Sequence, residues 1–263
     1  MKQLDNSHTD LALSYLSEEP EFNLFLTGDI ANCGMKSDLV RTYTADEWDE
    51  NKEFPYFILD YNGNFLVYSK DPVYDAKTVA HFLSSQTMHN LSGKQNIIEQ
   101  LCPYFPERRI QNTYMARLNK VDPAFSFSDI PVTKLGESDL EQIYELYMQI
   151  KEFAATYSGR SKENIIEGIK YNVHYGYKKD GILLAIAGLS ASTETSAMLV
   201  GVATHPDFRE QGYASAVVGK LCQNELESGK QFLCLFYDNP KAGRIYNRIG
   251  FKELGIYTML RSQ

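Results

Sequence analysis

Residues 200–215 decide how the rest of the chain is interpreted, and they read VGVATHPDFREQGYAS. Within residues 200–204 the larger side chains alternate with small or polar neighbours, which is the period of a β-strand. Pro206 cannot donate a hydrogen bond to a neighbouring strand, so the strand should end close to it. From Ala214 onward apolar residues recur at i, i+3, i+4 and i+7, the pattern of one helix face. The stretch therefore predicts a strand, a loop and the start of a helix.

The loop between that strand and that helix has the composition of a phosphate-binding site. Arg209 precedes two small residues, Gly212 and Ala214, which leave the first N–H groups of the helix uncovered. These groups lack intrahelical partners and lie at the positive end of the helix dipole, where phosphate binds readily. The loop therefore suits a pyrophosphate, although Arg-x-x-Gly-x-Ala on its own is common in ordinary strand-to-helix connections.

A second segment predicts another helix with well-defined ends. Residues 238–251 read DNPKAGRIYNRIGF and follow a β-rich run at residues 231–236. Asn239 is a favoured N-cap, and Pro240 is well tolerated at the first helical position. Gly250 is a typical helix terminator. The apolar face of this predicted helix is formed by Ala242, Ile245, Tyr246 and Ile249.

Taken together, the two segments resemble the GNAT superfamily of acetyl-CoA-dependent N-acetyltransferases. The resemblance rests on VxTxPxxRxxGYA at residues 202–214 and NPxAxxxYxxxGF at residues 239–251. Two motifs in this order, with a helix and a strand between them, are much more specific than either alone. The resemblance implies an α+β fold with a twisted, mixed β-sheet flanked by helices. Two strands splay apart at the centre of such a sheet, and the pantetheine arm inserts there.

The resemblance also implies roles for individual residues. Backbone N–H groups near Val202 and Ala203 would hold the pantetheine and stabilise the oxyanion of a tetrahedral intermediate. Asn239 would hydrogen-bond the arm of acetyl-CoA. Tyr246 would act as general acid, because a phenol stays protonated at neutral pH. The residues expected to bind acetyl-CoA are Val202, Ala203, Thr204, Arg209, Glu210, Gln211, Gly212, Tyr213, Ala214, Ser215 and Asn239.

The base that removes the proton from the amine is not visible in the sequence. The family often uses a glutamate on the central strands, whereas this chain has Met198 and Val200 there. His205 precedes the proline that ends the strand, so we expect it to point to solvent. The weak alternatives are Glu194, Glu145 and Glu152.

The first half of the chain resembles the second half in the order of its elements but lacks the phosphate-binding loop. Two β-rich runs flank Asn62 and Gly63, the strongest short signal of a hairpin. Residues 92–94, which read SGK, are interpreted as a turn before a helix. We therefore expect two GNAT-like domains: a degenerate one at residues 1–125 and an acetyltransferase domain that binds acetyl-CoA at residues 126–263.

The remaining local signals concern helix capping and histidines. Ser138 and Glu141 have the spacing of a capping box at the start of a helix. His8, His81 and His89 have no partner visible in the sequence and default to the surface or to helix faces. The degenerate domain is expected to act as a scaffold, to shape the acceptor site or to form the surface of a homodimer.

The amino-acid composition limits the kinds of partner that the protein is expected to bind. The formal net charge is −8, from 26 Lys and Arg against 34 Asp and Glu. This balance argues against nucleic acid as the main partner and mildly favours a cationic acceptor such as an amine. No apolar run approaches a membrane span, and the first residues contain no signal region. The four scattered cysteines lack metal-ligand spacing, so we expect free thiols, no metal and a cytoplasmic protein.

The leading functional hypothesis is an acetyl-CoA-dependent N-acetyltransferase. It would transfer an acetyl group to a primary amine of a small molecule or peptide by direct attack. One alternative is a non-catalytic acyl-CoA-binding regulatory protein, and another is an acyltransferase that uses a different acyl-CoA or an aminoacyl-tRNA. The motif tyrosine, Tyr246, favours catalysis, whereas the missing base keeps the non-catalytic alternative open. The acidic balance disfavours tRNA.

Overall fold

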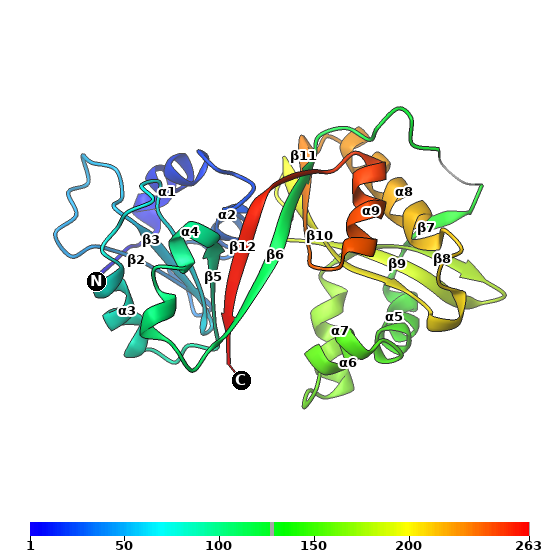
Figure 1. Ribbon diagram of the computed structural model, residues 1–263, viewed down its shortest axis with the longest axis horizontal. Helices are drawn as coiled ribbons and strands as arrows, with labels where there is room; N and C mark the ends of the chain where they lie inside the picture. The colour runs from blue at the N-terminus through cyan, green and yellow to red at the C-terminus, as the bar shows by residue number, and fades with distance from the viewer. Residues whose placement is uncertain (127–128, 263) are drawn as a thin grey trace. The chain divides into compact units, whose positions relative to one another are not determined.

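The computed structural model describes residues 1–126 and 129–262, and the chain divides into two compact units (Figure 1). The first unit contains Met1–Met115 and the C-terminal segment from Glu253, and the second contains Ala116–Lys252. Each unit combines a mixed β-sheet with helices, which confirms the predicted α+β class.

In the first unit the strands lie in the order β1-β2-β3-β4-β5-β12. β4 and β5 pair in parallel, and the other neighbours pair antiparallel. The strands are β1 (Lys2–Gln3), β2 (Val40–Thr44), β3 (Phe57–Tyr61), β4 (Asn64–Tyr68), β5 (Asn90–Lys94) and β12 (Lys252–Arg261), and β6 (Arg109–Leu118) leads into the second unit. The helices are η1 (Asn6–His8), α1 (Thr9–Leu16), α2 (Leu24–Cys33), α3 (Ala76–Ser84), α4 (Gln95–Ile98) and η2 (Cys102–Tyr104).

The predicted hairpin is confirmed between β3 and β4. Asn62 and Gly63 have φ values of 47° and 84°, as a two-residue type I′ turn requires. The Asp60 carboxylate accepts a hydrogen bond from the N–H of Gly63 at 2.6 Å. A Cβ at position 63 would also collide with His89 and the backbone of Thr87. Both the turn and the close approach therefore require glycine here.

The sheet of the first unit is buried on both faces. Phe57 and Leu59 of β3 pack in a cluster with α1 and α2, whereas Ile58 packs in a cluster with α3 and α4. Successive side chains of a strand point to opposite faces of the sheet. The continuous apolar run at residues 57–59 is therefore the signature of a strand covered on both sides.

Residues 92–94 lie in β5, so their interpretation as a turn is wrong. Gly93 is paired with Thr258 of β12. A Cβ on Gly93 would collide with the carbonyl oxygen of Val67 in β4. The glycine thus permits close packing within a sheet, which a local pattern cannot distinguish from a phosphate-like loop.

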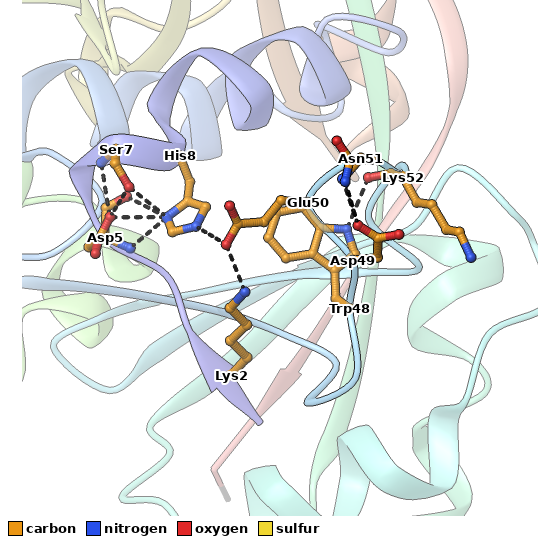
Figure 2. A network of polar contacts seen from close by, with 9 residues as sticks. All are labelled: Lys2, Asp5, Ser7, His8, Trp48, Asp49, Glu50, Asn51 and Lys52. Atoms are coloured by element: carbon orange, nitrogen blue, oxygen red, sulfur yellow. Dashed lines mark hydrogen bonds and ion pairs between the residues drawn. The ribbon is translucent and has the colours of Figure 1, made fainter.

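His8, which we expected at the surface or on a helix face, is buried at the end of η1 in the polar network that Figure 2 shows. Its Nδ1 lies 3.0 Å from an Asp5 carboxylate oxygen, and its Nε2 lies 3.3 Å from a Glu50 carboxylate oxygen. Lys2 donates to the same Glu50 oxygen at 2.9 Å and lies over the Trp48 ring. The spacing Asp-x-x-His forms a capping box around η1, a local signal that the sequence interpretation overlooked.

In the second unit the strands lie in the order β11-β10-β9-β8-β7, with β10 and β11 parallel and the other neighbours antiparallel. One apolar cluster contains residues of α5 and α7, and another contains residues of α8 and α9. Figure 1 shows these helix pairs on opposite sides of the sheet. The strands are β7 (Val132–Leu135), β8 (Val173–Lys179), β9 (Ile182–Ser190), β10 (Ser196–Thr204) and β11 (Phe232–Tyr237). The helices are η3 (Glu137–Asp139), α5 (Leu140–Met148), α6 (Lys151–Thr156), α7 (Lys162–Lys170), η4 (Pro206–Phe208), α8 (Tyr213–Glu227) and α9 (Pro240–Ile249).

The capping box predicted at Ser138 and Glu141 is wrong by two residues. The helical segment starts after Gly136, whose N–H donates to the Asp139 carboxylate at 2.7 Å. Lys178 also forms an ion pair with Asp139. This tertiary partner helps to fix the carboxylate at the helix start, and sequence spacing alone does not reveal it.

The structure groups the end of the chain differently from the expected division after residue 125. Residues of β12 pair with β5 from Tyr257 opposite Lys94 to Arg261 opposite Asn90. Tyr257 and Leu260 are buried, and Leu260 joins a core cluster of the first unit. The strand that follows α9 therefore completes the sheet of the first unit, because β5 offers it an edge and an apolar face.

Candidate functional site

Strands β10 and β11 stop pairing part of the way along their length. Their parallel register runs from Ser196 opposite Phe232 to Leu199 opposite Leu235. β10 continues to Thr204 and β11 continues to Tyr237. Among the described residues, the edge of β10 that faces β11 is therefore free of strand pairing after Leu199, as expected for two splayed strands.

A β-bulge interrupts β10 just after this point. Its pairing with β9 shifts between Val200 and Ala203. The intervening Gly201 has a φ of 62°, and its carbonyl accepts a hydrogen bond from the Tyr147 hydroxyl at 3.2 Å. A Cβ on Gly201 would collide with that hydroxyl. The alternating pattern of residues 200–204 concealed the bulge, and a glycine within a strand was the signal for it.

The Tyr147 side chain is held firmly beneath the bulge. Its ring stacks on Phe153 with centroids 4.5 Å apart and lies near Tyr157. Burial raises the pKa of its phenol above the ordinary value. Tyr147 is thus a protonated donor from α5 that supports β10, a role that sequence interpretation did not assign.

The loop before α8 leaves its backbone open. Gly212 is the N-cap, with a φ of 82°, and the space where its Cβ would stand is empty. Glu210 is also left-handed, with a φ of 63°. Within residues 1–126 and 129–262, no group accepts a hydrogen bond from the backbone N–H groups of residues 210–215. The exposed members of this predicted site are Arg209, Glu210, Gln211 and Gly212, and the half-buried ones are Tyr213, Ala214 and Ser215.

The corresponding helix of the first unit has its N-terminus filled. α3 follows β4 as α8 follows β10, and its N-cap is Asp75. The Asp75 carboxylate accepts the N–H of Thr78 at 3.0 Å. Hydrogen bonds from Thr78 hold the pKa of Asp75 below its ordinary value, so an anion already occupies this position. The first unit therefore lacks an open phosphate site at this helix.

The second motif begins next to the Gly212 loop. The Oδ1 atom of Asn239 accepts the N–H of Lys241 at 2.9 Å, which confirms the predicted N-cap and leaves the amide N–H₂ as a donor. The Lys241 ammonium lies 3.8 Å from the Glu210 carboxylate. This exposed ion pair brings the loop and the start of α9 together.

Tyr246 lies in the core between α9 and the sheet. Its ring is 5.7 Å from that of Tyr237 and 5.9 Å from that of Phe251. It shares an apolar cluster with Leu199 and Leu235, the last paired residues of β10 and β11. Burial, with a smaller effect of a neighbouring thiol, raises the pKa of Tyr246 to about 12. The phenol is therefore protonated at neutral pH and belongs to the apolar cluster that contains the last paired residues of the two strands.

The weak candidates for a base lie in separate places. The His205 Nδ1 accepts the N–H of Asp207 at 3.3 Å, and its ring packs against Phe208. Glu194 is in the turn between β9 and β10. Across the described ranges, neither residue forms a hydrogen bond or ring contact with Tyr246. Glu152 is exposed on α6, and Glu145 is exposed on α5.

Residues 1–126 and 129–262 contain no group of three or more His, Cys, Asp and Glu side chains that could hold a metal ion. In the same ranges, no helix is both long enough and apolar enough to cross a membrane. The cysteines are free thiols.

Sequence comparison identifies the class of protein that this arrangement defines. Residues 140–251 match the model of the acetyltransferase (GNAT) family. This region, which contains the diverging strands and the open helix end, therefore belongs to that family. A comparison with curated proteins gives no match.

Solved structures show that the whole chain has the fold of tandem proteins of this type. A Drosophila protein has a TM-score of 0.72 at 12% identity over 99% of this chain and 97% of its own. A tandem GNAT protein from the clavulanic acid biosynthesis pathway has a TM-score of 0.59 at 11% identity, over 98% of this chain and 97% of its own. A GCN5-related N-acetyltransferase from Sphaerobacter thermophilus has a TM-score of 0.60 at 12% identity, over 98% of this chain and 94% of its own. These matches confirm the predicted tandem architecture.

Proposed function

We propose that the protein is an acetyl-CoA-dependent N-acetyltransferase whose acceptor is a primary amine. The observation that carries the proposal is the divergence of β10 and β11 after Leu199 and Leu235, next to the uncapped N-terminus of α8. A free strand edge can bind the amide groups of a pantetheine arm as a neighbouring strand would. An open helix N-terminus can bind the pyrophosphate at the other end of that arm.

In this proposal the pyrophosphate accepts hydrogen bonds from the N–H groups that follow Glu210. The Arg209 guanidinium is exposed beside them and adds positive charge. Gly212 matters because any side chain there would occupy the open space that the phosphate needs. The free amide N–H₂ of Asn239 donates to the arm of acetyl-CoA.

The reaction is direct transfer without a covalent enzyme intermediate. The neutral amine attacks the thioester carbonyl, and a C–N bond forms as the carbonyl oxygen becomes an oxyanion. Backbone N–H groups at the bulge of β10, near Val202 and Ala203, stabilise this oxyanion. The C–S bond then breaks, Tyr246 gives its proton to the thiolate, the amine proton passes to water, and water returns a proton to the Tyr246 phenolate.

A binding experiment tests the cosubstrate site. CoA is titrated against the protein and against Gly212→Glu, which places bulk and negative charge among the loop N–H groups. We expect the Kd to rise about tenfold or more. Gly159→Glu is the matched control, since Gly159 has a φ of 78° and open space around it. Equal CoA affinity in Gly212→Glu and the wild type places the cosubstrate elsewhere.

Turnover on a panel of amines tests the reaction itself. Release of CoA from acetyl-CoA in the presence of an amine supports the proposal. CoA binding without turnover of any amine favours the non-catalytic acyl-CoA-binding alternative. Competition among acyl-CoAs of different chain length separates acetyl transfer from transfer of a longer acyl group.

A further inference from the structure

The β-bulge of β10 turns one peptide group out of the regular pattern of the sheet. In the pairing with β9, two residues of β10, Gly201 and Val202, stand opposite the single residue Ala187. Bulges of this kind change the direction of the groups that they carry, and they recur next to active sites. The Gly201 carbonyl accepts a hydrogen bond from the Tyr147 hydroxyl at 3.2 Å. This carbonyl is therefore turned toward α5.

The same peptide group carries the N–H of Val202. No peptide bond is cis among residues 1–126 and 129–262, and a planar trans peptide directs its C=O and its N–H in opposite directions. Tyr147 belongs to the apolar cluster of α5 and α7, whereas Val202 packs against the cluster that contains Tyr246. These helices lie on opposite sides of the sheet (Figure 1). With its carbonyl turned toward Tyr147, the peptide therefore presents the Val202 N–H on the side of the sheet where Tyr246 lies.

The hydroxyl that holds this peptide has little freedom. The Tyr147 side chain is buried, and its ring stacks on Phe153 with centroids 4.5 Å apart. A Cβ on Gly201 would stand 2.3 Å from the hydroxyl oxygen, so glycine is required for the approach. Phenylalanine at position 147 would fill the same apolar space without the cost of burying a hydroxyl. The hydroxyl therefore acts through the Gly201 carbonyl and not through packing.

We propose that Tyr147 is a positioning residue for acyl transfer, whose hydroxyl holds the peptide between Gly201 and Val202 so that the Val202 N–H is aimed at the oxyanion. This inference rests on the proposed function, because it assigns a role at the same stretch of β10. Stabilisation of an oxyanion depends on donors that are fixed in place before the reaction begins. Tyr147 supplies that restraint for one donor through a single hydrogen bond and does not contact the reacting atoms.

The orientation of the peptide is tested without any ligand. Tyr147→Phe removes the hydroxyl and keeps the ring that stacks on Phe153. In ¹H–¹⁵N NMR spectra the Val202 amide should shift more than any other amide of β10, because loss of a hydrogen bond at the Gly201 carbonyl changes the polarisation of that peptide. Tyr157→Phe is the matched control, since its ring lies 6.2 Å from that of Tyr147, and it should leave the Val202 signal in place. A Val202 signal that stays unmoved in Tyr147→Phe overturns the proposal.

Infrared spectra of bound acetyl-CoA, labelled with ¹³C at the thioester carbonyl, test whether the N–H reaches its target. A hydrogen bond from the protein lowers the stretching frequency of this carbonyl. The lowering should be smaller in Tyr147→Phe than in the wild type and in Tyr157→Phe, and the Kd for CoA should be the same in all three proteins. Equal frequencies in the wild type and Tyr147→Phe overturn the proposal.

Steady-state kinetics separate positioning from a purely structural role. In Tyr147→Phe we expect kcat to fall about tenfold with an unchanged KM for acetyl-CoA, since loss of an oxyanion donor itself costs about 10²–10³-fold. A structural role alone would lower the midpoint of thermal unfolding and leave kcat per folded molecule unchanged, which overturns the proposal. A wild type that does not bind CoA overturns the proposed function together with this inference. Normal CoA binding and turnover, with equal kcat in both proteins, overturns the role of Tyr147 alone.

Discussion

Tyr246 is the residue whose chemistry the transfer reaction depends on most. Tyr246→Phe removes the phenolic proton and keeps the ring between Tyr237 and Phe251. We expect kcat to fall about a hundredfold, the usual size of a lost general acid, with little change in CoA affinity. Steady-state release of CoA measures the first quantity, and calorimetric titration measures the second.

The control for this substitution is Tyr175→Phe. Tyr175 lies in the same apolar cluster, and its hydroxyl donates to Glu225 at 3.2 Å. This variant loses a phenolic proton away from the diverging strands, so its kcat should stay close to the wild-type value.

Because the pKa of Tyr246 is about 12, its deprotonation should not reduce turnover between pH 7 and 10. A wild-type kcat in Tyr246→Phe removes the residue from the mechanism.

Asp29 makes the stability of the first unit depend on pH. Burial raises the pKa of this carboxyl from 3.8 to about 7. The stability that the protonated carboxyl contributes is fully present below pH 3.8, where Asp29 is protonated in both the folded and the unfolded state. This stability is lost as the pH rises through about 7. Asp29→Asn should therefore raise the free energy of unfolding at pH 8, by up to about 4 kcal/mol. Urea unfolding at pH 5 and pH 8 checks this, with Asp38→Asn as the exposed control.

At the scale of elements, the bulge in β10 depends on a glycine beneath a tyrosine. Gly201→Ala places a methyl group against the Tyr147 hydroxyl and strains a residue with a φ of 62°. We expect a loss of about 1–3 kcal/mol in the free energy of unfolding. The loss should be smaller in a Tyr147→Phe background, because part of the collision is removed. Equal losses in both backgrounds, measured by a double-mutant cycle, would exclude this contact as the cause.

The elements that sequence interpretation located correctly carry their signals within a few residues. Asn62 and Gly63 specify their turn by backbone conformation, and Asn239 and Gly250 mark the two ends of α9. The Asp5–His8 capping box was also a local signal, although it was overlooked, whereas other missed features need a partner that is distant in the sequence. The hydrogen bond from Tyr147 to Gly201, for example, joins residues that no local pattern contains together.

The candidate site, like the fold, was predictable only where its signals lie within a few residues of one another. The open loop at Gly212 follows from residue size, so the sequence suggested it directly. A base for the reaction had no local signature, because the candidates Glu145, Glu152 and Glu194 lie on separate elements.

At the scale of the whole molecule, the first unit requires a strand from the end of the chain. Stopping the chain after residue 251 removes Tyr257 and Leu260 from the first unit. We expect a loss of about 3–6 kcal/mol in the free energy of unfolding of this unit. Hydrogen exchange of the β5 amides should become faster and should recover when a peptide of residues 252–262 is added. A scrambled peptide is the control, and unchanged exchange after truncation contradicts the expectation.

The late position of β12 has a consequence for the order of events on the ribosome. While residues 1–251 are being made, β5 has no strand of its own to cover the edge that β12 will take. That edge stays available to other nascent chains until α9 has been translated and the tunnel has released the next ten or so residues. The amino-terminal half is therefore finished last although it is synthesised first.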